Sequence, residues 1–253
     1  LTILNKNHMA FGLAPGSGTF IMFLYQMDGD LYRDNGRRSN LDDDVSIAAF
    51  KEYCRLYTDY QFERIFDFAN RFRTGEMPLG LADYTLYNTF QVFAPEIKGL
   101  WGFTTVPGIM RPDGTINNTV PASAMACMIM NNSKKKEESW EFIKWWTSAS
   151  VQARYGREME ALIGPSARYP TANLQALREL PWPVQDLARL EEQMRNLRGV
   201  PQVPGGYFTA RHIDNAYNKV VVLAEIGARE ALMDFVPIIN EEIEYKFNEF
   251  GFE

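Results

Sequence analysis

Histidine and cysteine are scarce in this chain of 253 residues, which contains two of each. The histidines, His8 and His212, lie far apart, so no H-E-x-x-H or facial-triad spacing is present. Cys54 and Cys127 form no C-x-x-C pair and are too few for a four-thiolate zinc site. Both have apolar neighbours, which predicts buried free thiols. We therefore expect neither a metal nor a cofactor.

Long apolar runs and excess positive charge are also missing. No stretch of about 18 apolar residues predicts a membrane-spanning helix, and residues 1–10 lack the basic-then-apolar plan of a signal peptide. The chain begins without methionine in an apolar segment, so we expect it to be part of a longer protein. Its 32 acidic and 26 basic residues give a net charge of −6, which repels phosphate backbones, so nucleic acid is not an expected partner.

Familiar catalytic and phosphate-binding motifs are absent as well. Ser17 lies in Pro-Gly-Ser-Gly-Thr, which lacks the spacing of a hydrolase nucleophile elbow. Neither a Walker A loop nor G-x-G-x-x-G occurs. Asp28, Asp30 and Asp34 lack the glycine and closing glutamate of a calcium loop. Carboxylates are numerous, so a carbohydrate-active enzyme with a carboxylate pair stays an alternative.

The hydrophobic pattern predicts helices that alternate with short strands. Three aspartates at Asp42–Asp44 precede a helical stripe that includes Val45, Tyr53 and Tyr57 and predict a helix N-terminus. The other expected helices cover about 61–73, 134–147, 184–197, 208–227 and 229–249, and the expected strands cover 20–25, 77–81, 101–106 and 124–130. This alternation is typical of an α/β protein.

Several segments resemble, in order and spacing, family 1 extracellular solute-binding proteins, the substrate receptors of ABC importers. Each motif alone is degenerate, so the resemblance rests on their order. The segments are FRTGEMPLGLADY (Phe72–Tyr84), WGFTTVPG (Trp101–Gly108), the strand and helix of Pro121–Gly156, IGPSARYPTA (Ile163–Ala172) and VPGGYFTARHIDNAY (Val203–Tyr217).

The resemblance implies an α/β, type II periplasmic-binding-protein-like fold in which two lobes close on a solute. On this basis residues 1–105 form an α/β part of the second lobe, 106–165 belong to the first lobe, and 166–253 are the helical return of the second lobe. The chain would then hold most of the second lobe and a segment of the first.

The same resemblance implies a non-enzymatic receptor for an oligosaccharide or related small solute, which works by lobe closure and delivers the solute to an ABC importer permease. It implies an extracellular or periplasmic, lipid-anchored protein whose only link to the membrane is an anchor outside this chain. A sensor ectodomain of the same fold is a further alternative to the carbohydrate-active enzyme.

Aromatic side chains beside polar groups are typical of sugar sites, because sugar rings stack on aromatic faces while their hydroxyls form hydrogen bonds. Tyr207 follows Pro204-Gly205-Gly206, and by the resemblance it occupies the stacking position. Arg211 and His212 come one turn later. As alternatives, Tyr207 packs the loop, Arg211 pairs with Asp214 or another acid on the surface, and His212 is a core or capping residue.

Four more candidates come from strand ends and the family's cleft. Asp83 and Tyr84 follow the strand expected at 77–81, where α/β proteins present ligand contacts; alternatively Asp83 caps the next helix and Tyr84 is a core residue. Thr19 and Phe20 follow a glycine-rich turn near the family's cleft, but a simple strand start is the preferred explanation for them.

Overall fold

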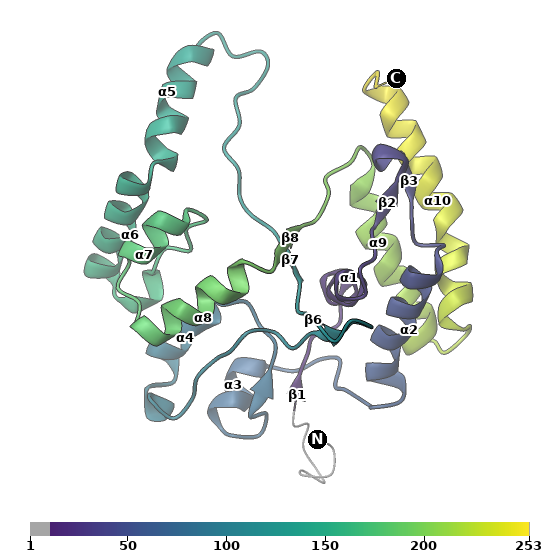
Figure 1. Ribbon diagram of the computed structural model, residues 1–253, viewed down its shortest axis with the longest axis horizontal. Helices are drawn as coiled ribbons and strands as arrows, with labels where there is room; N and C mark the ends of the chain where they lie inside the picture. The colour runs from purple at the N-terminus through teal and green to yellow at the C-terminus, as the bar shows by residue number, and fades with distance from the viewer. Residues whose placement is uncertain (1–10, 253) are drawn as a thin grey trace. The chain divides into compact units, whose positions relative to one another are not determined.

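The computed structural model describes residues 11–252, which divide into two compact units (Figure 1). Unit 1 comprises 11–81, 106–122 and 196–252, and unit 2 comprises 82–105 and 123–195. All five tryptophans, Trp101, Trp140, Trp145, Trp146 and Trp182, belong to unit 2. The lobe boundaries that the resemblance implies, at about residues 105 and 165, stay a prediction.

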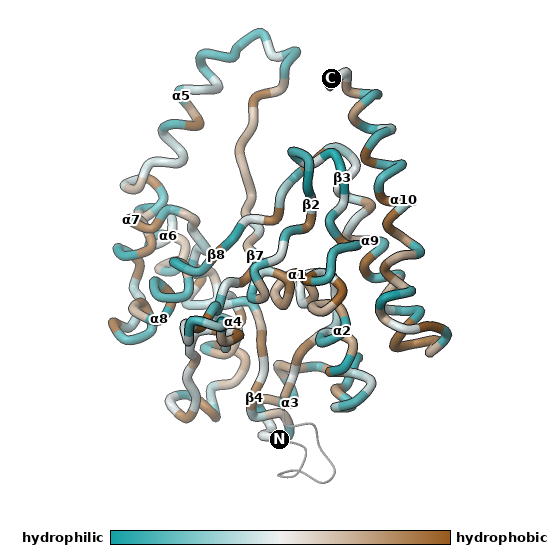
Figure 2. Tube along the Cα trace, turned by 45° about the vertical axis from the view of Figure 1, so that its right-hand side comes forward, coloured by the Kyte–Doolittle hydropathy of each residue, from teal (hydrophilic) through white to brown (hydrophobic). Residues whose placement is uncertain are grey.

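Unit 1 is mainly helical, and its principal helices pack around one core. α9 and α10 lie side by side, and α2 packs against both α1 and α10 (Figure 1). Hydrophobic and hydrophilic residues alternate along α10, as Figure 2 shows, which is the pattern of a helix with one buried face. The helices of unit 1 are α1 (Ser17–Gln26), η1 (Asp34–Gly36), α2 (Asp44–Thr58), α3 (Phe68–Arg73), α9 (Gly206–Tyr217), the π-helix η4 (Asn218–Val222) and α10 (Ala228–Glu249).

Short paired strands connect these helices. β1 (Phe11–Gly12) pairs in parallel with β4 (Leu79–Gly80), and β7 (Val120–Ala122) in parallel with β8 (Leu197–Gly199). The antiparallel pairs are β2 (Tyr32–Arg33) with β3 (Arg38–Ser39) and β5 (Ile109–Met110) with β6 (Ile116–Asn117). The Gly114 amide donates to the Arg111 carbonyl and closes the turn between β5 and β6.

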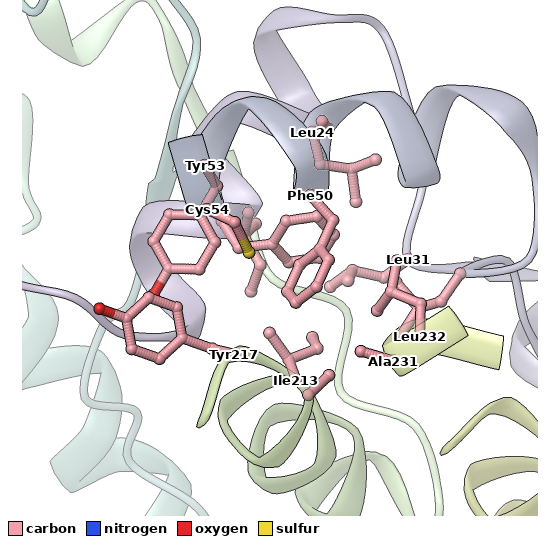
Figure 3. Packing of buried hydrophobic residues seen from close by; sticks show 14 of the residues in the cluster. Leu24, Leu31, Phe50, Tyr53, Cys54, Ile213, Tyr217, Ala231 and Leu232 are labelled. Carbon is pink, nitrogen blue, oxygen red and sulfur yellow. The ribbon is translucent and has the colours of Figure 1, made fainter. Parts of the chain in front are cut away.

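The core of unit 1 is rich in aromatic rings from α1 and α2 (Figure 3). The rings of Phe20 and Phe50 meet edge to face at 5.5 Å, and Tyr53 lies 5.1 Å from Tyr217 of α9. The Tyr53 hydroxyl accepts a hydrogen bond from the Gly16 amide at 2.8 Å. This bond pairs a donor just before α1, where the helix has no capping side chain of its own.

Unit 2 contains a second, smaller core of Leu177, Leu180, Trp182 and Leu190. Buried Arg168 is paired with Glu160 at 2.7 Å, and its guanidinium lies 4.5 Å from the centre of the Trp182 ring. The helices of this unit are α4 (Leu86–Phe93), η2 (Pro95–Ile97), α5 (Lys136–Thr147), α6 (Ala149–Ile163), η3 (Pro165–Ala167), α7 (Leu174–Glu179) and α8 (Val184–Met194).

Most of the long helices lie where the sequence predicts them. The Asp43 carboxylate accepts from the Ser46 amide at 2.6 Å and caps α2, as the run of aspartates predicts. The helix expected over 61–73 forms only from Phe68, because Asp67 caps it there by accepting from the Asn70 amide. α10 continues through Pro237.

Three strand predictions and one orientation are wrong. The apolar run 20–25 is part of α1, and residues 101–106 and 124–130 have no strand structure. Helical periodicity over 134–147 predicts that Trp140 faces inward, which is also wrong, since 53% of this residue is exposed. Among residues 11–252, no helix has the length and apolar character needed to cross a bilayer.

The two cysteines differ in burial, which corrects the prediction that both are buried. Cys54 is buried and Cys127 is exposed, and burial raises the pKa of the Cys54 thiol to about 12. Because the thiolate is the reactive form, we expect maleimide at neutral pH to label Cys127 within minutes and Cys54 only after denaturation. Mass spectrometry of peptides measures both rates, and Cys127→Ser is the control. Equal labelling of both thiols in the native protein would contradict this assignment.

Candidate functional site

The first turn of α9 is positioned by a glycine that allows close approach to α10. Gly205 has a left-handed φ of 77° and immediately precedes α9. A Cβ atom at this position would lie 2.8 Å from the Glu242 carbonyl oxygen and 2.9 Å from the Ile243 Cα. Both the backbone conformation and the lack of space therefore require glycine, and together they fix where α9 begins.

Tyr207 lies in this first turn and is largely solvent-exposed. The exposed fraction of the residue is 74%, and its ring contacts Phe208 at 5.2 Å between centroids. Arg211 is also exposed and follows one helical turn later, so both side chains lie on one face of α9. An exposed ring beside a guanidinium combines a stacking surface with hydrogen-bond donors. Its exposure disagrees with the alternative that Tyr207 only packs the loop.

Asp214 contacts α1 from the next turn of α9. Its carboxylate accepts a hydrogen bond from the Ser17 amide, and burial raises its pKa. This bond supplies a second acceptor to the N-terminus of α1, beside the Tyr53 hydroxyl that accepts from Gly16. Arg211, which one alternative pairs with Asp214, is exposed on the face that carries Tyr207.

His212 packs against α10. Its ring stacks on Phe235 with centroids 5.1 Å apart and an interplanar angle of 27°. The Asn215 amide nitrogen lies 3.4 Å from Nδ1. Burial and then the Arg211 charge lower the pKa of this imidazole, so the folded protein favours its neutral form. These contacts match the packing role given as the alternative for His212.

This lowered pKa predicts that His212 makes the protein less stable in acid. The unfolded chain binds the proton more readily, so the stability that neutral His212 contributes is present above the unfolded pKa and is lost as pH falls through it toward the folded pKa. We expect the free energy of unfolding of the natural protein, relative to His212→Gln, to decrease between about pH 7.5 and pH 5. Urea unfolding at both pH values measures the difference. If the natural protein instead gained stability relative to His212→Gln as the pH fell, the assignment would be contradicted.

Thr19 and Phe20 lie in the first turn of α1. The Thr19 hydroxyl donates to the Ala14 carbonyl at 2.9 Å. Phe20 is completely buried in the core of unit 1, where it packs against Phe50 and Tyr53. A fully buried ring offers no surface to a solute, so the prediction of Phe20 as a contact is corrected to a core residue.

Asp83 and Tyr84 belong to unit 2, between β4 and α4. The strand they follow is not buried as expected, because Leu79 is half exposed. Asp83 is exposed, and its backbone carbonyl, rather than its side chain, accepts from the Leu86 amide. Tyr84 packs 6.4 Å from the Trp182 ring, and burial raises its pKa to about 12. Tyr84 therefore joins the small core of unit 2 while keeping part of its surface.

Two of the three carboxylates noted in the sequence near residue 30 form ion pairs. Asp28 is bonded to Arg111, with the shortest contact at 2.5 Å, and Asp30 is paired with Arg198. Between Phe11 and Phe252 no group of three histidine, cysteine or acidic residues is arranged to hold a metal ion. His8 lies outside the described residues.

Comparison with known families places the chain in one of them. Residues 6–153 match the family of bacterial extracellular solute-binding proteins. The chain belongs to this family. A comparison with curated proteins finds no match.

Solved structures of members of this class resemble the chain at low sequence identity. The sugar-binding protein MalE from Xanthomonas citri is 17% identical with a TM-score of 0.75, over 100% of this chain and 62% of that protein. A Thermotoga lettingae solute-binding protein bound to α-D-tagatose is 16% identical with a TM-score of 0.68, over 94% and 60%. The acarbose-binding GacH receptor of Streptomyces glaucescens is 16% identical with a TM-score of 0.64, over 94% and 60%.

These likenesses confirm the expected fold class. The mixed α/β chain has the fold of periplasmic binding proteins and spans about 60% of the length of the similar structures.

Proposed function

We propose that the protein is a sugar receptor, and that Tyr207 and Arg211 contact the solute. The observation that carries this proposal is the exposed ring of Tyr207 on the same face of α9 as Arg211, in a chain that belongs to a solute-binding family. The ring supplies a face for the C–H groups of a pyranose, and the guanidinium supplies donors to its hydroxyls.

Similar structures support a sugar as the solute. One similar protein is described as sugar-binding, another holds tagatose, and a third binds acarbose. The chemistry common to these solutes is a polyhydroxylated ring. We therefore propose an oligosaccharide or a related small sugar as the ligand class.

For unit 2 taken by itself, Asp83 and Tyr84 are proposed as solute contacts. Exposed Asp83 carries a carboxylate that can accept hydrogen bonds from sugar hydroxyls. Tyr84 is held by its packing against Trp182, so its ring is ordered before any solute binds. Thr19 is not proposed as a solute contact, because its hydroxyl already donates to the Ala14 carbonyl.

The proposed receptor delivers its solute to an ABC importer permease and breaks no bond. It works outside the cell or in the periplasm. Lipid anchoring and the closure of two lobes on the solute are predictions that rest on the family resemblance. A solute that contacts both lobes would favour the closed state by its differential affinity for that state.

A thermal-shift screen of the full-length protein against a sugar panel tests the proposal. A ligand that binds only the folded state raises the apparent melting temperature by mass action. We expect a shift with at least one of maltose, maltotriose, tagatose or acarbose, and no new products by chromatography after long incubation. Absence of a shift across mono- and oligosaccharides would remove the sugar assignment, and released products would favour the carbohydrate-active enzyme.

A further inference from the structure

Unit 1 contains an apolar pocket between α2 and the segment where α10 begins. Its volume is about 340 Å³, at the small end of the range for ligand pockets. Four side chains supply its apolar surface: Ile47 and Cys54 of α2, Val220 of η4 and Ala228 of α10. Cys54 is buried and neutral at physiological pH, so it acts as part of the apolar lining.

Three cationic side chains line the same pocket, and its lining contains no carboxylate. They are Lys51 and Arg55, one turn apart on α2, and Arg229 of α10. Acidic neighbours lie outside the lining: Arg55 is bonded to Glu52 and Asp59, and Arg229 is 3.7 Å from Asp44. The hydrogen bonds orient the Arg55 guanidinium. A guanidinium has five N–H donors, so both arginines have donors beyond those used by these acids.

We propose that this pocket binds a free amphipathic monocarboxylate with a short hydrocarbon chain. The charge arrangement selects the occupant: a carboxylate fits a lining that holds three cationic side chains and no acid, and the apolar lining removes hydrocarbon surface from water. A neutral sugar matches neither feature, because its hydroxyls would lose hydrogen bonds against the apolar lining. The site is therefore separate from the proposed sugar contacts at Tyr207 and Arg211.

Calorimetric titration of the 253-residue chain with octanoate tests this proposal. We expect saturable binding, with amide chemical-shift changes concentrated at the lining residues of α2 and α10. Acetate lacks the hydrocarbon chain and octanol lacks the charge, so each should bind at least tenfold more weakly. Raising the salt concentration should weaken octanoate binding, because exposed charges are screened.

Variants separate the pocket from general attraction to a charged protein. The double variant Lys51→Gln with Arg229→Gln should weaken octanoate binding at least tenfold. The control pair Lys134→Gln with Lys135→Gln removes two exposed charges from unit 2 and should leave binding unchanged. The proposal is overturned if octanoate fails to bind, if both pairs weaken it equally, or if the shift changes lie elsewhere. Sugar binding by the Lys51→Gln, Arg229→Gln protein should be unaffected, so failure here is distinguishable from failure of the sugar assignment.

Discussion

Replacing Gly205 with alanine should destabilise unit 1 by about 2–4 kcal/mol. A left-handed backbone at a residue with a side chain costs about 1–2 kcal/mol, and the added Cβ would lie within 3 Å of two backbone atoms of α10. Because those atoms are main chain, relief requires α9 and α10 to move apart. Hydrogen exchange of peptides from both helices measures the effect, with faster exchange expected in the variant.

Gly114→Ala is the matched control for this prediction. Gly114 has a similar left-handed φ of 83°, but a Cβ atom at this position would have no neighbour within 4 Å. This variant should therefore show only the conformational cost, about 1–2 kcal/mol. Equal destabilisation by the two substitutions would mean that the close approach of α10 contributes nothing to the requirement for glycine.

Replacing Tyr207 with alanine should weaken sugar binding at least tenfold without lowering the melting temperature of the sugar-free protein. The ring is largely exposed, so its removal leaves no cavity in the core. Its proposed stacking surface contributes about 1.5 kcal/mol or more to binding, and each 1.4 kcal/mol corresponds to a factor of about ten in affinity. Calorimetric titration of the full-length protein, with a sugar that gives a thermal shift, measures the change.

Two other tyrosine variants make this result specific. Tyr207→Phe keeps the ring and should retain most of the affinity. Tyr245→Ala removes another exposed tyrosine of unit 1, from α10 rather than α9, and should leave the affinity unchanged. Sugar affinity that survives Tyr207→Ala would exclude Tyr207 from the site.

Helices with a local signal were predictable, and helices defined by long-range packing were not. The aspartates before α2 supply a cap within the sequence itself, so its start could be identified. The run Phe20–Tyr25 is apolar throughout, and such a run gives no periodicity that separates a buried helix from a strand. α1 is a helix packed against α2 and α9, segments that are distant in sequence.

The strand predicted over 124–130 failed for a different reason. Apolar, β-favouring composition identifies residues that are suited to a strand, but a strand also needs a hydrogen-bonded neighbour. The residues described by the structure provide no such neighbour for this segment, and Met125 and Met128 are exposed. The apolar neighbours of Cys127 also predicted that it is buried, whereas the structure shows that it is exposed.

The family resemblance selected Tyr207, and helical spacing added Arg211 one turn later; the structure places both exposed on one face of α9, while their contact with a solute stays a prediction. Burial of Phe20 and the stacking of His212 on Phe235 depend on tertiary contacts that no local pattern contains. The cationic pocket was missed for the same reason: Lys51 and Arg55 are neighbours on α2, but Arg229 joins them only through the packing of α10.

The restriction of tryptophan to one compact unit gives this protein a natural spectroscopic separation. Indole emission, excited selectively at the long-wavelength edge of the absorption band, reports the surroundings of residues in unit 2 alone. Tyrosines occur in both units, so a transition that the indole emission does not follow is the one to assign to unit 1. Indole emission in a denaturation experiment therefore identifies the transition of unit 2 without an added dye.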